Sequence, residues 1–309
     1  MKKFLLASFL ICCTLFADIN TTKKELDFRE KITNSYHSFL NNIDCYIADY
    51  EDINQSNYKK ISKNKLYLIF SFKNSKDNPL QKNLYLKANI RLPQTQKKLE
   101  ITLSKQTIND MDNQNIDANN ERALEDEKLH VGFKYYLYKE RYSIIFAKLG
   151  FRLHSPFGIY GEFAMQKSYF YHTLQTILES NIYYYINKDY IKASAAITFF
   201  KPLSDTYILE QKNEVLLDYE SKSRKLKQTL RLYHFINTKT RMQYQLTYAS
   251  FDDDVCNLCQ DWYGANINFH HNVKKWLFFE VIPQVLKRRE NSFEFEKIVT
   301  INFGITFSK

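Results

Sequence analysis

The chain has 309 residues, a formal net charge of +10, and an aromatic content of 16%, with 23 Tyr and 24 Phe. Its mean hydropathy is polar, at −0.47. Beyond residue 17 no run of about 20 apolar residues occurs, so the sequence excludes a transmembrane helix from the mature chain. The basic residues are scattered rather than clustered, which argues against a nucleic-acid partner.

Residues 1–17 have the features of a secretory signal peptide. Two N-terminal lysines precede an apolar run over 4–13 that is too short to span a bilayer, and Ala17 is the small residue before a predicted cleavage at Asp18. A lipoprotein signal built on Cys12 or Cys13 is the alternative, but the residue before a lipidated cysteine is normally small. We therefore expect the mature chain to be exported.

Residues 18–62 are expected to form an N-terminal helical segment and a linker. Apolar residues recur at helical spacing over 22–49, without Gly or Pro, which predicts an amphipathic helix. Such a helix could plug a lumen, lie on the periplasmic membrane surface or contact a partner. Cys45 is the odd cysteine of this segment and is expected to be a small buried residue.

From residue 63 to 309 the hydrophobic period changes to two. Over 293–307, Lys297 is the one residue of the first face that is not apolar, and Ile298 is the one large apolar residue of the second face. Because side chains alternate across a strand, this pattern predicts one apolar and one polar surface. Polar residues interrupt the apolar face in the middle of three earlier runs, at Ser180, Gln211, Asn213 and Gln228.

Runs of this kind predict about fourteen strands, within a range of 12–16. They are expected near 65–73, 82–92, 97–105, 129–138, 142–154, 158–170, 173–185, 190–200, 206–218, 224–236, 241–250, 261–271, 275–286 and 293–307. The long connections 74–81, 106–128 and 251–260 all fall on one side, as in outer-membrane barrels. The predicted fold is therefore all-β: a transmembrane antiparallel meander β-barrel. The alternative is a soluble sandwich or lipocalin-like barrel with the apolar face inward, which alternation alone does not distinguish.

The C-terminal run Asn302-Phe303-Gly304-Ile305-Thr306-Phe307 resembles the β-signal that the outer-membrane insertion machinery reads. Asn302, Gly304 and Phe307 stand at its signal positions, although Lys309 replaces the usual final aromatic residue. The mature chain also resembles a family of uncharacterised proteobacterial outer-membrane β-barrel proteins that have an N-terminal helix. The resemblance lies in a Leu-Pro hairpin over 90–100 and an aromatic, Glu- and Pro-containing strand over 276–283. It implies a location in the cell outer membrane of a Gram-negative bacterium, and it implies no activity.

Three partners follow from these expectations: the insertion machinery during biogenesis, the outer-membrane lipid, and lipopolysaccharide, whose negative charge suits the basic chain. The pair Cys256 and Cys259 is expected to form a disulfide in an oxidising compartment. Free thiols or a metal site are the alternatives, and a metal site would need two more ligands. We expect no cofactor, no metal and no enzyme, because neither Ser155 beside His154 nor the 252–254 aspartates with His270 form a recognisable catalytic motif.

The predicted inner faces carry many charges, with basic residues in excess. The candidate selectivity residues are Lys87, Arg91, Lys98, Arg152, Lys225, Lys227, Arg231, Glu280, Glu294 and Glu296. Charged walls of a water-filled pore set ion selectivity, so one hypothesis is a porin-like passive channel for small polar or anionic solutes. The alternative interpretation of these charges is that they pair with one another in the polar core of a closed barrel without a pore. The alternative function is a non-catalytic structural or surface-interaction protein that uses the acidic stretch 106–128.

Overall fold

The computed structural model describes Thr33 and residues 65–75, 80–91, 99–104, 129–153, 158–186, 190–219, 222–252 and 259–307. The signal peptide over 1–17, the helical segment over 22–49 and the domain boundary near 62 lie outside these ranges, so they stay predictions. Among the described residues, no helix has the length and apolar character needed to cross a membrane.

The described residues form fourteen strands and one short 3-10 helix, η3 (Arg289–Asn291). The strands are β1 (Lys65–Ser75), β2 (Gln81–Arg91), β3 (Leu99–Ser104), β4 (Leu129–Lys139), β5 (Ser143–Leu153), β6 (Gly158–Tyr171), β7 (Leu174–Tyr185), β8 (Tyr190–Pro202), β9 (Tyr207–Asp218), β10 (Ser223–Phe235), β11 (Thr240–Asp252), β12 (Cys259–Lys274), β13 (Leu277–Arg288) and β14 (Phe295–Phe307). This count confirms the predicted fourteen.

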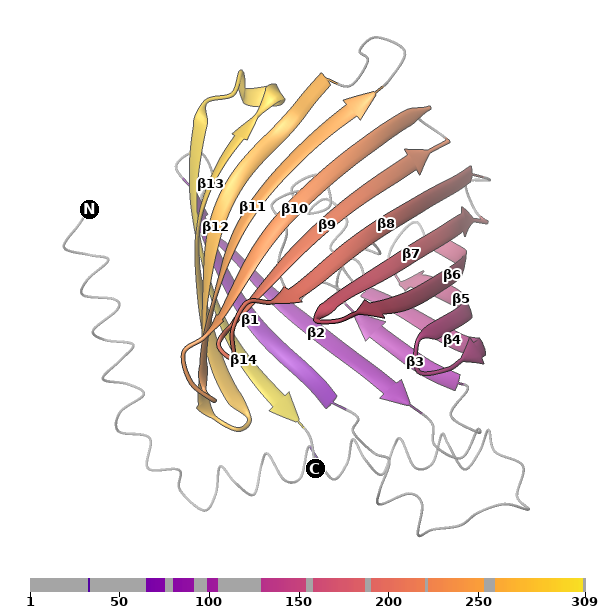
Figure 1. Ribbon diagram of the computed structural model, residues 1–309, viewed down its shortest axis with the longest axis horizontal. Helices are drawn as coiled ribbons and strands as arrows, with labels where there is room; N and C mark the ends of the chain where they lie inside the picture. Colours follow the sequence, from indigo (N-terminus) through magenta and orange to yellow (C-terminus); the bar gives the residue numbers. More distant parts are fainter. Residues whose placement is uncertain are drawn as a thin grey trace, which may run out of the picture.

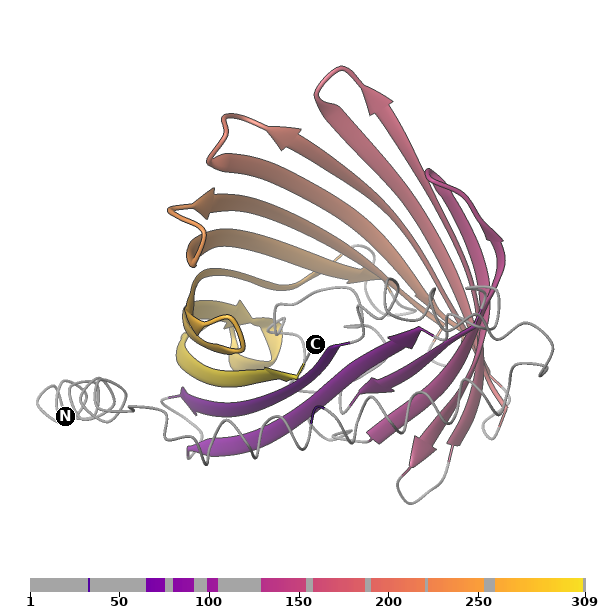
Figure 2. The ribbon, with the colours of Figure 1, turned by 90° about the horizontal axis from the view of Figure 1, so that it is seen from below.

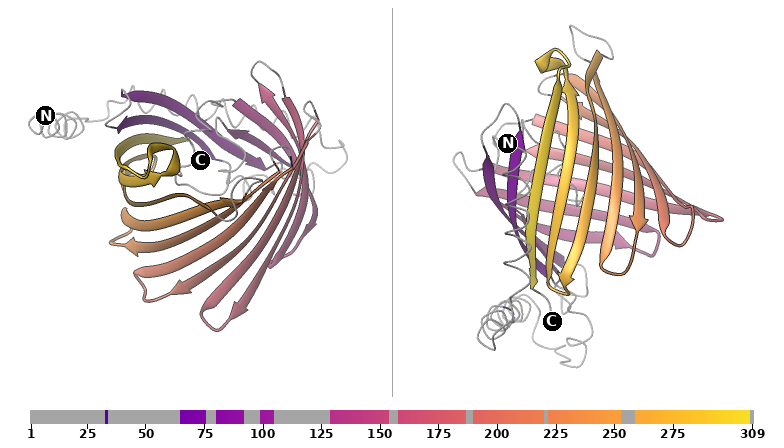
Figure 3. Two further views of the ribbon diagram at one scale, coloured as in Figure 1. Left: turned by 90° about the horizontal axis from the view of Figure 1, so that it is seen from above. Right: turned by 90° about the vertical axis from the view of Figure 1, so that its left-hand side faces the viewer.

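The strands form a closed antiparallel meander (Figure 1). Each strand pairs with the next in sequence, and β1 pairs with β14, with Leu66 opposite Phe307 at one end of the seam and Ser75 opposite Ile298 at the other. Closure leaves no free sheet edge. This matters in a membrane, because hydrocarbon cannot form hydrogen bonds with the unpaired backbone N–H and C=O groups of an edge strand. Seen from one end, β12–β14 curl tightly, whereas β6–β10 spread into a broad wall (Figure 2). The same contrast appears from above and from the side (Figure 3).

Burial shows which face of each strand points inward. Along β14 the inward Glu296, Thr300 and Asn302 are at most 5% exposed, whereas the intervening Phe295 is 66% and Val299 37% exposed. The same inversion holds around the barrel, where large apolar side chains are exposed on the outside and polar ones are buried inside. Apolar side chains outside and polar ones inside define a membrane barrel, so the soluble alternative is excluded.

Two predicted boundaries near the C-terminal end are wrong. β12 continues through Lys274, past a register shift after Asn272, so the tight turn is Lys275-Trp276 rather than 272–274. β14 begins at Phe295, because η3 and the left-handed residues Ser292 and Phe293, with φ of 50° and 60°, occupy the positions before it. These local backbone turns leave no signal in a two-residue hydrophobic period.

The tight curl of β13 and β14 includes a glycine that faces an aromatic ring. Gly304 lies directly opposite Phe278, and a Cβ at Gly304 would come within 1.9 Å of the Phe278 ring. A glycine here lets the ring lie flat against the neighbouring backbone, which is a known way to build curvature into a barrel wall. Gly150 and Tyr160 form the same kind of cross-strand pair between β5 and β6.

Candidate functional site: the polar inner wall

The inner wall gathers buried polar side chains from most of the strands. The set that is less than a tenth exposed includes Glu100, Lys148, Ser194, Glu210, Arg231, Gln243, Gln245, Glu280, Arg288, Glu296 and Asn302. They converge because every second residue of each strand points inward. A fourteen-strand barrel encloses more space than its side chains fill, so the properties of this wall decide what the lumen accepts.

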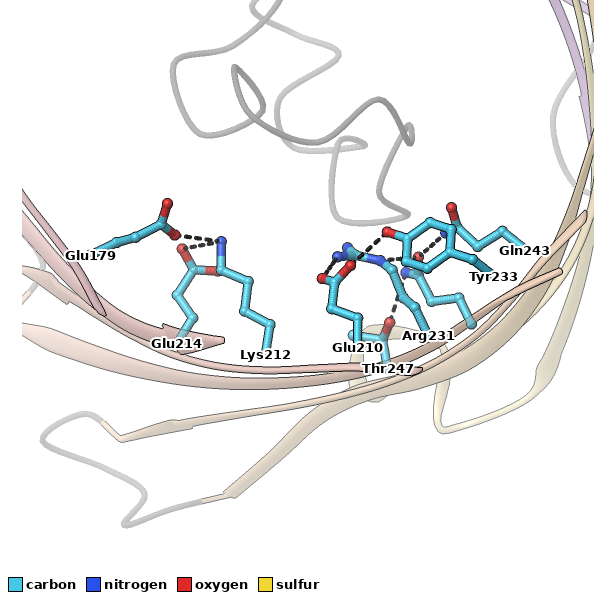
Figure 4. A network of polar contacts seen from close by, with 9 residues as sticks. Glu179, Glu210, Lys212, Glu214, Arg231, Tyr233, Gln243 and Thr247 are labelled. Carbon is cyan, nitrogen blue, oxygen red and sulfur yellow. Dashed lines mark hydrogen bonds and ion pairs between the residues drawn. The ribbon is translucent and has the colours of Figure 1, made fainter. Parts of the chain in front are cut away.

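A network of largely buried polar side chains on β9, β10 and β11 includes Glu210, Arg231, Tyr233, Gln243, Gln245 and Thr247 (Figure 4). The Arg231 guanidinium pairs with the Glu210 carboxylate and donates through Nε to Gln245 Oε1 at 2.9 Å. Tyr233 donates its hydroxyl to the other Glu210 oxygen at 2.6 Å. Gln245 continues the chain by donating to Thr247 Oγ1 at 3.0 Å. Arg231 is 1% exposed and Glu210 4%, so this pair is a structural clasp across three strands rather than a charge open to solvent.

Lys212 forms a second cluster beside that clasp (Figure 4). Its Nζ lies 3.8 Å from Glu179 of β7 and 3.9 Å from Glu214 of its own strand. Glu210, Lys212 and Glu214 occupy alternate positions of β9, so all three project to the same face with alternating sign. Their side chains retain some exposure at Lys212 (15%) and Glu214 (29%), which places these charges where a solute in the lumen would meet them.

Glu280 centres a third cluster on β12, β13 and β14. It accepts from Asn302 Nδ2 at 3.0 Å and contacts His270 Nδ1 at 3.0 Å. His270 in turn lies 3.3 Å from Asn272 Oδ1. Within the described part of the chain no group of three His, Cys, Asp or Glu residues is arranged to hold a metal ion.

Further ion pairs tie neighbouring strands of the wall together. Lys148 and Glu162 pair at 3.4 Å between β5 and β6, and both side chains are under a tenth exposed. Lys192 pairs with Asp218 at 3.0 Å, Lys225 with Asp261 at 3.9 Å, and Arg288 with Glu296 at 3.7 Å. Because opposite charges alternate along the wall, much of its field cancels locally.

One sector of the inner wall is apolar. Ala249, Trp262, Leu286 and Ile298 form a buried cluster on β11–β14, and Phe278 and Ile282 are also buried on this side. The cluster coincides with the tightly curled part of the barrel (Figure 3). Charged side chains therefore line both parts of the wall, with Lys148, Glu210 and Lys212 among those on β5–β10 and the Glu280 and Arg288 clusters beside the apolar sector on β12–β14.

The structure places the predicted selectivity residues unequally. Lys87 on β2 and the neighbouring pair Lys225 and Lys227 on β10 lie on the inner face and are partly exposed. Arg231, Glu280 and Glu296 lie inward but are buried in the clusters above. Glu294 precedes β14 and is exposed beyond the strand. Arg91 and Arg152 lie on β2 and β5 with side chains outside the described set, and Lys98 lies wholly outside it.

The sequence pattern did not predict some of the inner-wall residues. Arg288 and Asp218 occupy inward positions at strand ends, and Asp261 falls at a register shift opposite β11. His270 appeared in the sequence only beside a candidate catalytic aspartate, and here it contacts Glu280 instead. A strict two-residue count starting from the correct strand ends would have found Arg288 and Asp218, but not Asp261.

The remaining predicted positions fall at the two ends of β12 and β14. Cys259, the first residue of β12, is disulfide-bonded. Cys256 lies outside the described residues, so the pairing of these two cysteines stays a prediction. Of the insertion-signal positions, Asn302 and Phe307 are 2% and 7% exposed, and Gly304 packs under Phe278. Each of them has a packing role in the folded barrel.

Comparison with solved structures returns outer-membrane barrels. The outer-membrane channel DcaP of Acinetobacter baumannii is 10% identical, covering 79% of this chain and 96% of that chain with a TM-score of 0.48. A loop-deletion mutant of OmpT, an outer-membrane protein of Vibrio cholerae, is 10% identical, covering 79% and 98% with a TM-score of 0.47. The CymD monoaromatic hydrocarbon channel is 6% identical, covering 80% and 88% with a TM-score of 0.47.

No family model matches the chain. No curated protein matches it in sequence either. The resemblance to one particular family of uncharacterised barrels therefore stays an expectation. The class of the protein follows from its own structure: a closed fourteen-strand antiparallel barrel with an apolar outside and a polar inside is an outer-membrane β-barrel.

Proposed function

We propose that this chain is a passive outer-membrane channel for small polar solutes, with a weak preference for anions. The observation that supports the proposal is the charged and partly exposed surface of the inner wall. Its broad side presents ionised side chains that keep part of their surface exposed, among them Lys212, Glu214 and Lys225. A wall of this kind suits hydrated solutes, because water and fixed charges replace lost hydration.

The ion pairs limit how selective such a channel would be. Lys212 faces two carboxylates and Lys225 faces Asp261, so each fixed cation is accompanied by a nearby anion. Salt further screens charges that line a water-filled wall, with a Debye length of about 8 Å at physiological ionic strength. We therefore infer modest anion selectivity that falls as salt is raised, rather than a dedicated site for one solute.

Reversal potentials across planar bilayers in a salt gradient test this assignment. The double variant Lys225→Gln with Lys227→Gln removes two inward charges from β10 and should shift selectivity toward cations. Arg224→Gln is the matched control, since Arg224 is the exposed residue next to Lys225 and, by strand alternation, lies on the other face. Equal shifts in both variants would show that the inner wall does not set the selectivity.

A second comparison concerns the N-terminal segment. Removal of residues 19–62 should raise conductance if the predicted helix plugs the lumen and leave it unchanged if the helix lies outside. A barrel that conducts in neither form would favour a non-catalytic structural or surface-interaction protein.

A further inference from the structure

The outer face of the broad wall carries three carboxamide side chains at positions where an outer-membrane barrel has apolar side chains facing lipid. By strand alternation, Gln211, Asn213 and Gln228 lie on the same face as the exposed Val215 and Leu230, on β9 and β10. Gln228 lies directly opposite Asn213, and Gln211 lies opposite Leu230 at the next outward pair. They stand well inside their strands, away from both rims, with Asn213 near the midpoint of Tyr207–Asp218.

Carboxamides in this position are costly in a lipid environment. Among the residues that the structure describes, no hydrogen bond joins any of these three side chains to the rest of the barrel. Hydrocarbon offers neither donors nor acceptors, so an amide that faces it loses the hydrogen bonds it had in water. Polar side chains and small residues on a lipid-facing surface are characteristic of protein–protein contacts within membranes.

A groove begins beside the carboxamides. It has a volume of about 570 Å³ and is lined on the outer face by Leu230, Leu246, Tyr248, Ala265 and Val285, with Gln211 and Gln228 at one end. Leu230, Leu246, Ala265 and Val285 follow one another across β10–β13 in a single row of cross-strand partners. The short Ala265 side chain between Leu246 and Val285 makes this row concave.

On the other side of the carboxamides, the outer face exposes large apolar side chains. Phe163 and Met165 of β6 and Leu178 and Ile182 of β7 are between 40% and 49% exposed. Consider two copies related by a two-fold axis that runs along the membrane normal and passes in front of β9 and β10. Strands β11–β13 of one copy then lie opposite β8–β6 of the other. The groove of one barrel would then face these exposed apolar side chains of its partner, and Figure 1 shows β6–β13 side by side in this order.

We propose that this outer face of β9 and β10 is the contact surface for a second copy of the same chain. A carboxamide is both donor and acceptor, so Gln228 and Asn213 of one copy can satisfy the same pair of the other across a two-fold axis. The proposal rests on the membrane-embedded outer face and not on channel activity. A monomeric barrel that still conducts would therefore overturn it without touching the proposed function.

Cysteine cross-linking in native outer membranes tests the contact. Asn213→Cys and Gln228→Cys, each in a Cys45→Ser background, should give a disulfide-linked band at twice the chain mass on non-reducing gels. Phe70→Cys is the control, because Phe70 is 42% exposed on the outer face of β1, far from β9 in strand order. Absence of the band at both test positions, or an equal band in the control, overturns the proposal.

The triple variant Gln211→Leu, Asn213→Leu and Gln228→Leu provides the second arm. Leucine suits a lipid-facing surface, so the barrel should fold, as shown by its heat-dependent gel mobility. Its mass in mild detergent should fall from that of two chains to that of one. Persistence of the dimer in this variant overturns the proposal, as does a wild-type barrel that is monomeric and carries a bound lipid or an unrelated protein at this face.

Discussion

The guanidinium of Arg231 on β10 is joined to the carboxylate of Glu210 on β9, and both side chains are almost completely shielded from solvent. A simple pore model would treat Arg231 as a selectivity charge whose replacement leaves assembly unaltered. The structure corrects that interpretation, since the pair clasps three strands together through Tyr233 and Gln245.

Arg231→Gln should therefore destabilise the barrel. Removing one partner of a buried ion pair leaves the other charge uncompensated, at a cost of about 3–5 kcal/mol. Urea unfolding of the refolded barrel, followed by tryptophan fluorescence, measures the loss. Lys225→Gln is the control, because that lysine is 42% exposed and 3.9 Å from its partner, and such pairs contribute about 0–1 kcal/mol. Equal losses would show that the clasp has no special role.

A second prediction tests the inside–outside assignment on adjacent residues of β7. Ile182 is 48% exposed on the outer face, whereas Asn181 points inward and donates to Ser194 at 3.4 Å. Ile182→Arg should destabilise the barrel by up to about 4 kcal/mol, because the charge enters hydrocarbon. Asn181→Arg should cost much less. The reverse order in folding titrations into vesicles would invert the assignment.

Thr300 and Ile301 of β14 are a less suitable pair for this test, because Thr300 is tightly packed. The last strand suggests Ile301 and Thr300 as the obvious pair, and Thr300 does point inward as predicted. However, Thr300 is only 5% exposed, between Lys73 of β1 and Ile282 of β13. An arginine there would meet packed neighbours, so it would report steric crowding rather than polarity.

A third prediction separates two roles of Gly304. Gly304→Val should impair folding, because its side chain would collide with the Phe278 ring. If packing is the whole reason, Phe278→Ala in the same chain should restore heat-dependent gel mobility after refolding in vitro. If the insertion machinery reads Gly304 directly, the double variant will refold in vitro yet fail to assemble in cells. Failure of the double variant in both settings would contradict the packing explanation.

A fourth prediction concerns the disulfide at the start of β12. Cys259 is disulfide-bonded, and Cys256 is its predicted partner. Thiol labelling of the denatured, non-reduced protein should leave both cysteines unmodified, while Cys45 reacts. A Cys256→Ser variant should expose Cys259 to the reagent with little loss of stability, because the closed loop is short. If Cys259 is instead labelled in a Cys45→Ser variant but not in the Cys256→Ser variant, its partner is Cys45.

The architecture was predictable because one face of each strand had to meet lipid. That constraint imposes a two-residue period over 63–309 and fixes the strand count, the meander and the polarity of both faces. The pairing of inner charges was not predictable in the same way. Arg231 and Lys227 are both basic inward residues of β10, yet Arg231 alone lies opposite Glu210 within reach of Tyr233. Register, curvature and the tight curl of β12–β14 decide such differences, and they depend on contacts between distant strands.

Single-channel recording in planar bilayers tests the central claim most directly. Purified full-length protein, and the same protein without residues 19–62, should insert and give stepwise conductance in at least one form. The reversal potential should indicate a weak anion preference that declines as salt increases. A correctly folded barrel, verified by its gel mobility, that shows no conductance in either form would contradict the account of this protein as a channel.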